Sequence, residues 1–460
     1  MFPIKFSVLC VCLFCSATLL GCASTSTRSE LPTPTPQHLH PSEDDAKDTD
    51  NAIDSNGAVV DDSEKHPDSS NVTETASENG ETALPGTTVV PEEPGIQEVE
   101  KVVPSTPASL AAQAGDYGTA RRLALEDARQ NHSEDLTEFW SYVDDDPLMS
   151  HSLIDELRPH GTNAISALGG GSTVSFKYTD SADESAKAAL KPDQDLRQTM
   201  YRSGIAFYRL CQILGCHFQI PVTRHAQFSR SDFNALYSAS TSPKNKAYRA
   251  KFDHLIWDKS SGTPTLHLAY KEWIPSFGGF PIENTRAWSS YLDPRVSEYP
   301  SLDKFMNKIY EYPNSRRNVK KALSYLEGLT TRDILQQISD LILVDYLTNN
   351  WDRFSGAADN YGANCHITTG GIIAIDNDAA FPAWHAPRVV KRLHFVRVFS
   401  RTLVENLRLL NPDELMSRLI PDPTREELKS YERFKERRKD ALHYIDNLIQ
   451  KYGEDAVLAF

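Results

Sequence analysis

Apolar and polar positions alternate with the periods of both helices and strands in the C-terminal three quarters of the chain. Between residues 195 and 215 the steps are four and three residues, which matches one face of a helix. The positions on that face are Met200, Gly204, Phe207, Cys211 and Leu214. The pattern predicts a helix that ends at Gly215, because glycine is the usual residue just past a helix C-terminus.

Further helices are predicted on both sides of this one. Three short amphipathic segments precede it, at 120–130, 135–143 and 150–158. A long segment at 331–347 begins with Thr331 as a possible N-cap, and the C-terminal segment opens with the capping-box pair Thr424 and Glu427.

Short apolar runs bounded by Gly, Asp and Ser predict strands. We place them near 163–168, 172–178 and 186–191, followed by an extended segment at 218–228 and a strand that ends at Pro275. Residues 276–318 are predicted to be rich in loops. The order of elements predicts an α+β fold with two lobes, in which residues 109–275 form a helical preface and a small β-rich N-lobe. Residues 276–460 then form a larger, mostly helical C-lobe, with a binding site expected where the lobes meet.

The first residues have the pattern of a secretory signal. Lys5 precedes an apolar run that ends in Leu-Leu-Gly-Cys, with the cysteine at position 22. This ending resembles the bacterial lipobox, and the resemblance implies a signal peptide at 1–21 and lipidation of Cys22, with acyl chains such as palmitate. A lipid anchor holds a protein to a membrane without spanning it. Ala23 and Ser24 follow the cysteine, which by the same resemblance favours the outer membrane, facing the periplasm or the cell surface.

Residues 22–108 are predicted to be a disordered tether, because Ser, Thr, Pro and acidic residues dominate and aromatic residues are almost absent. Residues 43–101 contain 17 Asp and Glu against three Lys, so the rest of the chain carries a net charge of −1 out of a total of −15. The acidity therefore belongs to the tether, which as a flexible coil of about 85 residues would span roughly 50 Å. No basic surface suggests a nucleic-acid partner, and we expect a monomer.

The seven cysteines form no disulfide framework and no CxxC metal motif. Three lie in the predicted signal peptide and one is Cys22. Of the other three, Cys211 and Cys216 could pair in an oxidising compartment or remain free thiols, and Cys365 has no obvious partner.

Two aspartates and two asparagines surround one short predicted hairpin. Asp352 follows the long helix, Asp376 ends the apolar run 372–375, and Asn360 and Asn364 lie between them. A hard cation such as Mg²⁺ takes one or two carboxylates together with phosphate oxygens. Phosphoryl transfer needs one Asp to accept a hydroxyl proton, and an Asn and a second Asp to hold metal.

The pattern N-x-D-R, then Asn, a hairpin and I-D-N-x-x-A-F resembles the catalytic region of atypical protein-kinase-like enzymes. These include the Golgi casein kinase/four-jointed, HipA-like and phosphatidylinositol 3-/4-kinase-like families. The resemblance implies a two-lobed kinase-like fold that uses ATP with Mg²⁺ or Mn²⁺. It makes Asp352 the catalytic base and Asp376 a metal ligand, with Asn364 as the asparagine ligand and Asn360 as the second choice.

The predicted N-lobe resembles the same families through its glycine run at 169–171 and the segment AALKP. By this resemblance Lys191 contacts the nucleotide phosphates, with Lys177 as the rival lysine, and Glu272 and Trp273 form a hinge beside the adenine. These families carry a glutamate on the N-lobe helix to orient the lysine. At the matching place this chain has residues 202–205, Arg-Ser-Gly-Ile, so Glu184 or Asp195 would have to substitute, or the lysine is held in another way.

Simpler interpretations of the same residues exist. Asp352 and Arg353 could form a surface ion pair, and Asp376 with Asn377 could be a turn-forming pair. Taken together, the motifs predict a membrane-anchored extracytoplasmic kinase that phosphorylates an unknown protein or glycan hydroxyl. The alternatives are a catalytically inactive kinase-like binding module and a transferase that uses the same site to transfer AMP.

Overall fold

The computed structural model describes residues 106–151, 164–168, 173–180, 185–196, 200–238, 249–311, 319–354 and 362–460. The predicted signal peptide, Cys22 and nearly all of the predicted tether lie outside the described residues. So do residues 152–158 of the helix predicted at 150–158, the glycine run at 169–171, Glu184 and Asn360. Helix α1 begins at Pro107, two residues before the predicted start of the folded part.

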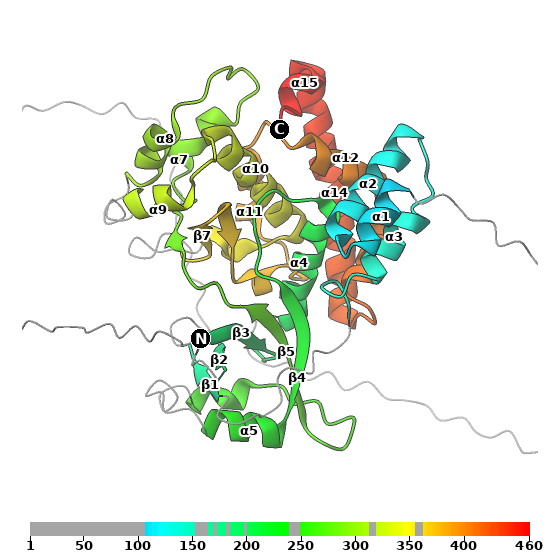
Figure 1. Ribbon diagram of the computed structural model, residues 1–460, viewed down its shortest axis with the longest axis vertical. Helices are drawn as coiled ribbons and strands as arrows, with labels where there is room; N and C mark the ends of the chain where they lie inside the picture. The colour runs from blue at the N-terminus through cyan, green and yellow to red at the C-terminus, as the bar shows by residue number, and fades with distance from the viewer. Residues whose placement is uncertain are drawn as a thin grey trace, which may run out of the picture. The chain divides into compact units, whose positions relative to one another are not determined.

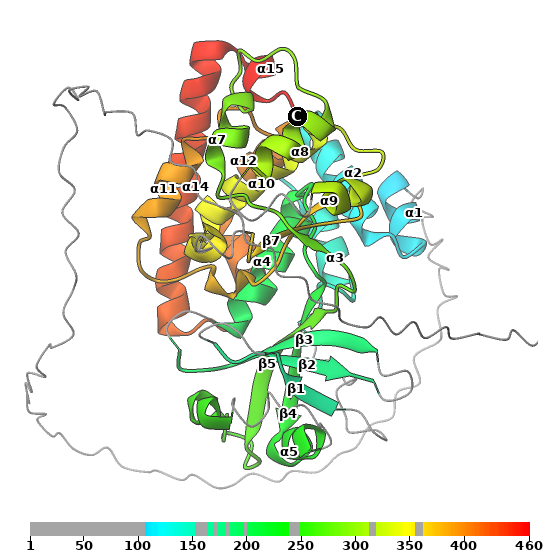
Figure 2. The ribbon, with the colours of Figure 1, turned by 90° about the vertical axis from the view of Figure 1, so that its left-hand side faces the viewer.

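A five-stranded antiparallel sheet forms the small lobe, in the order β1-β2-β3-β5-β4 (Figure 1). Its strands are β1 (Ala164–Ala167), β2 (Phe176–Thr179), β3 (Ala186–Pro192), β4 (Thr223–Ser229) and β5 (Thr265–Glu272). All of them fall within or next to the predicted extended segments. Helix α5 (Arg230–Ser238) covers one face of the sheet, as Figure 2 shows. The sequence patterns did not predict α5, whose Phe233 packs edge-on against Phe176 of β2 at 5.4 Å between ring centroids.

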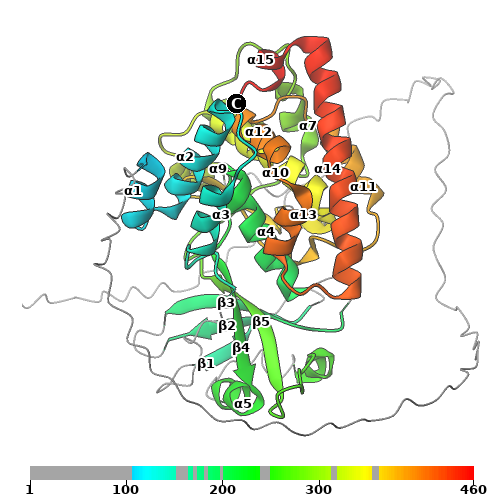
Figure 3. The ribbon, with the colours of Figure 1, turned by 90° about the vertical axis from the view of Figure 1, so that its right-hand side faces the viewer.

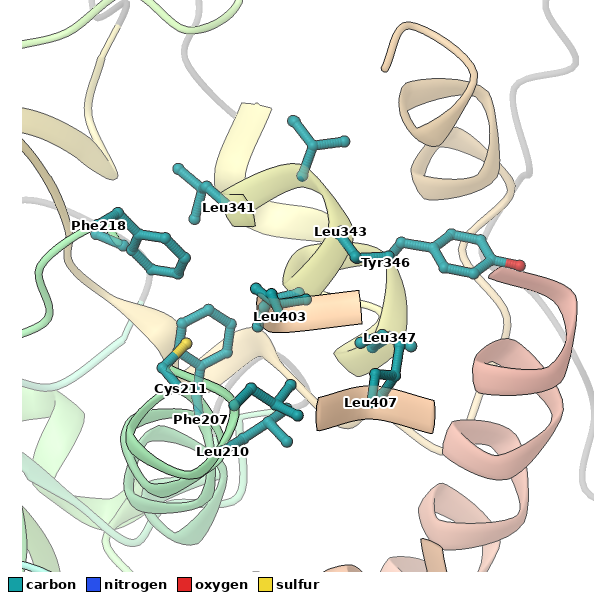
Figure 4. Close-up of a cluster of buried hydrophobic side chains, with 14 of the residues drawn as sticks. Phe207, Leu210, Cys211, Phe218, Leu341, Leu343, Tyr346, Leu347, Leu403 and Leu407 are labelled. Carbon is teal, nitrogen blue, oxygen red and sulfur yellow. The ribbon is translucent and has the colours of Figure 1, made fainter. Parts of the chain in front are cut away.

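Helix α4 (Tyr201–Leu214) lies between β3 and β4 in the sequence, yet its buried face belongs to the other lobe. Figure 4 shows Phe207, Leu210 and Cys211 facing leucines of α10 (Thr331–Thr348) and α12 (Arg401–Leu409). The helix begins six residues later than the predicted segment and ends, as predicted, where Gly215 adopts a left-handed backbone with φ +72°. Helix α4 also contacts β4 and β5 of the sheet, so it packs against both lobes.

Helices surround α10 to form the large lobe, and α10 has apolar residues buried on all sides. The other helices are α7 (Thr285–Trp288), α8 (Leu302–Ile309), α9 (Val319–Tyr325), α11 (Pro387–Leu393), α13 (Pro412–Leu419), α14 (Arg425–Tyr452) and α15 (Glu454–Val457), with the 3-10 turn η3 (Ser289–Tyr291). The N-cap of α10 is Thr330, which forms a capping box with Asp333, so the expected cap at Thr331 is wrong. The capping box of Thr424 and Glu427 at the start of α14 is confirmed.

The N-terminal helices α1 (Pro107–Gln113), α2 (Tyr117–Gln130) and α3 (Thr137–Asp144) pack on the large lobe, beside α12 and α13 (Figure 3). Arg129 of α2 forms an ion pair with Glu405 of α12 at 2.5 Å. Arg418 of α13 pairs with Asp144 at 2.5 Å and lies over the ring of Trp140. The preface therefore extends the helical core, although it precedes the sheet in the sequence.

A small second sheet, β6-β7-β8, lies in the large lobe on the side of the five-stranded sheet. Its strands are β6 (Gly278–Gly279), β7 (Cys365–Thr368) and β8 (Gly371–Ala374). The 3-10 turn η5 (Trp351–Phe354) follows α10, and the 3-10 turn η6 (Asn377–Ala379) follows β8. The hairpin predicted from the sequence thus exists, with a one-turn segment at each end.

The architecture confirms an α+β fold with a small β-rich lobe and a larger, mostly helical lobe.

Three described cysteines, Cys211, Cys216 and Cys365, are free thiols, so the possible disulfide is not formed. In the loop after α4, the Nδ1–H of His217 donates a hydrogen bond at 2.8 Å to Oδ2 of the buried carboxylate of Asp340 on α10. Among the described helices, none combines the length and apolar character needed to cross a membrane.

Candidate active site

A buried arginine holds the segments around the hairpin together. Arg353 is 1% exposed and pairs with Asp345 of α10, Nε to Oδ2 at 3.1 Å. Its other nitrogens donate to the backbone oxygens of Asn364 and Ile375 and to Oδ1 of Asn377. One guanidinium therefore fixes the end of α10, the start of β7 and the end of β8. The interpretation of Asp352–Arg353 as a surface ion pair is wrong, because Arg353 is buried and its carboxylate partner is Asp345.

Asp352 lies in η5, immediately before this arginine. The side-chain amide of Asn364 donates to Oδ2 of Asp352 at 3.0 Å and to its backbone oxygen at 2.9 Å. These two bonds orient the carboxylate of Asp352. The structure thus brings together two of the predicted site residues that are twelve positions apart.

Asp376 has a strained backbone. It adopts φ +52° and ψ +51°, the left-handed region that residues with side chains seldom occupy. Such conformations persist where the surrounding structure imposes them, and they are concentrated at functional sites. Asp376 is also not the turn-forming residue of the simpler interpretation, since its side chain caps no backbone N–H of η6.

The lysine predicted from the small lobe meets this aspartate. Lys191 of β3 is 4% exposed, and its Nζ donates to Oδ1 of Asp376 at 3.2 Å and to Oγ1 of Thr173 at 2.7 Å. The side chain of Asp376 is 40% exposed, so one side of the ion pair faces solvent. The rival Lys177 lies instead over the ring of Trp273, 5.5 Å from its centroid. The contacts therefore favour Lys191 over Lys177.

A second lysine and a second carboxylate complete the charged cluster, and the sequence patterns had assigned a role to neither. Lys271 of β5 contacts Oδ2 of Asp378 at 2.5 Å, and Lys191 lies 3.9 Å from the same oxygen. The side chain of Asp378 is fully buried. The spacing I-D-N-D, which puts the two aspartates two positions apart at a strand end, was the signal that could have identified Asp378.

Two carboxylates were proposed from the sequence to orient the lysine. Asp195 bonds to Nδ1 of His254 at 2.7 Å and is largely exposed, so it does not take that place. Glu184 lies outside the described residues.

The charges in the cluster influence one another strongly. Burial alone would lower the pKa of Lys191, but Asp376 and Asp378 outweigh burial and raise it. Burial opposes ionisation of Asp376 too, yet Lys191 and Lys271 hold the pKa of that carboxyl well below its usual range. Burial raises the pKa of Asp378, against the opposing effect of the two lysines. Asp376 is accordingly the more strongly anionic of the two carboxylates, and it is the one that solvent reaches.

A mostly apolar cavity of about 270 Å³ opens beside this pair, lined by the sheet, by the segment that follows β5 and by the two residues that follow β8. Lys191, Lys271 and Asp376 line its polar end, and Leu168, Pro221 and Phe277 are among the residues of its apolar part. Its lining suits an apolar, planar base that carries a charged group.

Glu272 and Trp273 also line the cavity, as the hinge prediction requires. Their N–H groups donate to the backbone oxygens of Val222 and Lys187, each at 2.9 Å. These two donors are therefore engaged within the sheet and are not free for a nucleotide base.

The donor set suits Mg²⁺ or Mn²⁺ bound together with phosphates. Hard cations take oxygen ligands, and Mg²⁺ usually binds through one or two carboxylates and substrate phosphates. The exposed oxygen of Asp376 and the amide oxygen of Asn364 are ligands of this kind. Among the described residues, no three His, Cys, Asp or Glu side chains form a metal cage of their own. A cation here would depend on the phosphates of its ligand.

No known family model matches the sequence, and no curated protein matches it. The solved structures that match the chain include the following three. The Golgi casein kinase has a TM-score of 0.41 and 15% identity over 68% of this chain and 80% of that chain.

Hydra Fam20 with sugar has a TM-score of 0.39 and 13% identity, over 64% of this chain and 87% of that chain. The amicoumacin kinase hAmiN, in complex with AMP-PNP, Ca²⁺ and Ami, has a TM-score of 0.19 and 14% identity, over 64% and 74%. At these identities and TM-scores no activity carries over to this chain.

Proposed function

We propose that this protein is an ATP-dependent phosphotransferase that transfers a phosphoryl group to a protein or glycan hydroxyl. The observation that carries the proposal is the contact between Lys191 of the small lobe and Asp376 of the large lobe. These side chains, 185 positions apart, meet at 3.2 Å at the polar end of an apolar cavity. A lysine and an exposed aspartate converging there supply opposite charges for phosphates and for a divalent cation.

Asp352 acts as the catalytic base in this proposal. Its carboxylate accepts the proton of the acceptor hydroxyl, and the amide of Asn364 holds it in the orientation needed. Proton acceptance by a positioned carboxylate typically contributes about 10²- to 10⁴-fold in rate. The backbone of Asp352 is held by its neighbour Arg353, which also bonds to the residue before Asp376. Base and metal ligand therefore keep a fixed spacing.

Asp376 and Asn364 would hold the divalent cation, and Lys191 would contact the phosphates. When bound, the cation neutralises charge on the β- and γ-phosphate oxygens. A lysine suits the phosphate-binding position because its ammonium is a compact charge on a flexible stem. The apolar part of the cavity would take the base of the nucleotide.

We further propose that the protein works at a membrane surface, as an outer-membrane lipoprotein anchored through lipidated Cys22. The acidic segment that follows would separate the folded part from the bilayer, since like charges extend a flexible chain. The site would then face the periplasm or the cell surface. Labelling of growing cells with a palmitate analogue tests the anchor, and Cys22→Ser should abolish the label.

The test of the activity is transfer of label from ATP. The purified chain would be incubated with Mn²⁺, a cell-envelope extract and ATP labelled at either the γ- or the α-phosphate. We expect γ-label in an acceptor and its loss in both Asp352→Ala and Asp376→Ala. Calorimetry should show that Asp352→Ala still binds ATP and Mn²⁺, whereas Asp376→Ala loses the metal-dependent part of binding. Full transfer by Asp352→Ala would contradict the assignment of the base.

The two alternatives have distinct outcomes in the same experiment. Transfer of α-label without γ-label would identify an AMP transferase. Absence of binding heat at millimolar ATP would identify a binding module without nucleotide chemistry. The missing helix glutamate favours an inactive module, but Asp378 supplies a carboxylate to the lysines from another element.

A further inference from the structure

We propose that Asp378 is the positioning residue for a two-lysine phosphate clamp, Lys191 and Lys271, and that Gly204 makes room for its carboxylate. This inference rests on the proposed function and assigns a role within the same site to three residues that the motifs left without one. Asp378 touches neither nucleotide nor acceptor in this scheme, because its side chain is fully buried. Its effect is on the two lysines.

Lys191 and Lys271 project from the same face of the sheet. In the antiparallel pairing of β3 and β5, Lys191 is opposite Ala269 and Lys271 is opposite Ala189. Residues two apart on a strand share a face, so the two lysines are diagonal neighbours on one face. Both line the polar end of the cavity. Two ammonium groups at this spacing repel each other, and a carboxylate placed between them offsets that repulsion.

Asp378 provides that anion from the large lobe. Its Oδ2 is 2.5 Å from the ammonium of Lys271 and 3.9 Å from that of Lys191. Asp376 contacts Lys191 as well, but Asp376 is the exposed carboxylate that a cation would occupy. Once Asp376 binds metal, Asp378 is the carboxylate that stays with the lysines.

Gly204 of α4 allows this arrangement. A Cβ at position 204 would lie 2.2 Å from Oδ1 of Asp378, closer than any real contact. A glycine inside a helix costs about 1 kcal/mol relative to alanine, and α4 has ordinary helical geometry there, so helix formation does not call for glycine. The space that a helix side chain would fill is filled by the carboxylate instead. Oδ1 of Asp378 has no hydrogen-bond partner among the described residues.

The backbone fixes the helix and the carboxylate relative to each other. The N–H of Met200, the N-cap residue of α4, donates to the backbone oxygen of Asp378 at 3.1 Å. Asp378, which is held against α4, thereby takes the place of the glutamate that the resembling families carry on this helix. Asp378 and the glycine that makes room for it, Gly204, are 174 positions apart in the sequence. The acid therefore does not appear within residues 202–205 of the helix itself.

The experiment is a double-mutant cycle on the full chain, with ATP and Mn²⁺ as the ligand. Binding constants from calorimetry, and KM and kcat for ATP, would be measured for Asp378→Ala, Gly204→Ala and the double variant. Asp378→Asn keeps the shape and removes the charge. Gly118→Ala is the matched control, since a Cβ in that helical position has only an ordinary contact at 3.7 Å.

We expect Asp378→Asn and Asp378→Ala to weaken nucleotide binding about 10- to 100-fold, the loss typical of a hydrogen bond between charged groups. The change should fall mainly on KM, because Asp378 does not touch the acceptor or Asp352. Gly204→Ala should weaken binding too, and the double variant should bind no more weakly than Asp378→Ala. A methyl group at position 204 has nothing to displace once the carboxylate is absent.

Wild-type affinity in Asp378→Asn would overturn the inference while leaving the proposed function intact, as would additive effects in the cycle. Failure of the wild-type chain to bind ATP with Mn²⁺ would overturn the proposed function and the inference with it. If Asp378→Ala does not fold, as judged by circular dichroism, the other two variants test the same contact. Asp378→Asn changes the carboxylate, and Gly204→Ala changes the helix residue that lies against it.

Discussion

Replacing Arg353 with methionine tests whether one buried guanidinium holds the catalytic segments together. The substitution keeps an unbranched side chain in the core but removes five hydrogen bonds to Asp345, Asn364, Ile375 and Asn377. It also leaves the carboxylate of Asp345, which is 1% exposed, without its counter-charge. Breaking a buried pair by removing one partner costs about 3 to 5 kcal/mol.

This cost can be converted into a melting temperature. Unfolding entropy near 60 °C is about 2.1 cal/mol/K per residue, which for roughly 350 folded residues gives about 0.7 kcal/mol/K. We therefore expect Arg353→Met to lower Tm by about 4 to 7 °C in differential scanning calorimetry. Nucleotide binding should also weaken, because the backbone on both sides of Asp352 and Asp376 loses its common anchor.

The matched control is Arg295→Met. Arg295 also pairs with an aspartate, Asp293, but its side chain is 70% exposed, and exposed ion pairs contribute little to stability. We expect a Tm change of about 1 °C or less for this variant. The double variant Arg353→Met/Asp345→Asn should recover part of the loss, since it no longer buries a lone charge. The reasoning is refuted if Arg353→Met melts within 1 °C of the wild type, or if both arginine variants lose the same amount.

Three further predictions follow from single contacts. Lys191→Met should weaken ATP binding about tenfold or more in calorimetry, whereas Lys177→Met should bind as the wild type does. Gly371→Ala should destabilise the chain far more than Gly262→Ala in thermal unfolding, because both glycines have positive φ but only a Cβ at 371 would collide with a side chain, at 2.2 Å. Hydrogen bonding to the buried carboxylate of α10 raises the pKa of His217, so its contribution to stability is full below pH about 6.5 and is lost as the pH rises through the higher folded pKa. The Tm of the wild type relative to His217→Gln should therefore fall between pH 6 and pH 8, and a constant difference would contradict this.

Local patterns in the sequence were sufficient for most of the secondary structure. The strand segments, the long helix that ends near Asp352 and the capping box at Thr424 all follow from short-range periodicity and capping chemistry. The helix at 201–214 was predicted with its end at Gly215 and with a start that was too early. Helix α5 was missed although Ser229 marks its start, since the hydroxyl of Ser229 accepts a hydrogen bond from the N–H of Asp232 at 3.1 Å as an N-cap does.

The sequence also identified the acidic part of the site, because Asp352, Asn364 and Asp376 lie within one hairpin. Residues so close along the chain meet whenever the hairpin forms, so a motif can report them. The contacts in the structure show that these residues lie close together, whereas their roles in catalysis remain predictions.

Only the tertiary structure decided which groups come to that hairpin from elsewhere. Strand alternation tells which face a lysine occupies, but the pairing of β3 with β5, which are separated in the sequence by α4, β4 and α5, decides that Lys191 and Lys271 are neighbours. Helical periodicity placed Gly204 on an apolar face, whereas in the fold it lies against the carboxylate of Asp378. Contacts between distant segments depend on how lobes pack, and short-range periodicity contains no information about that packing.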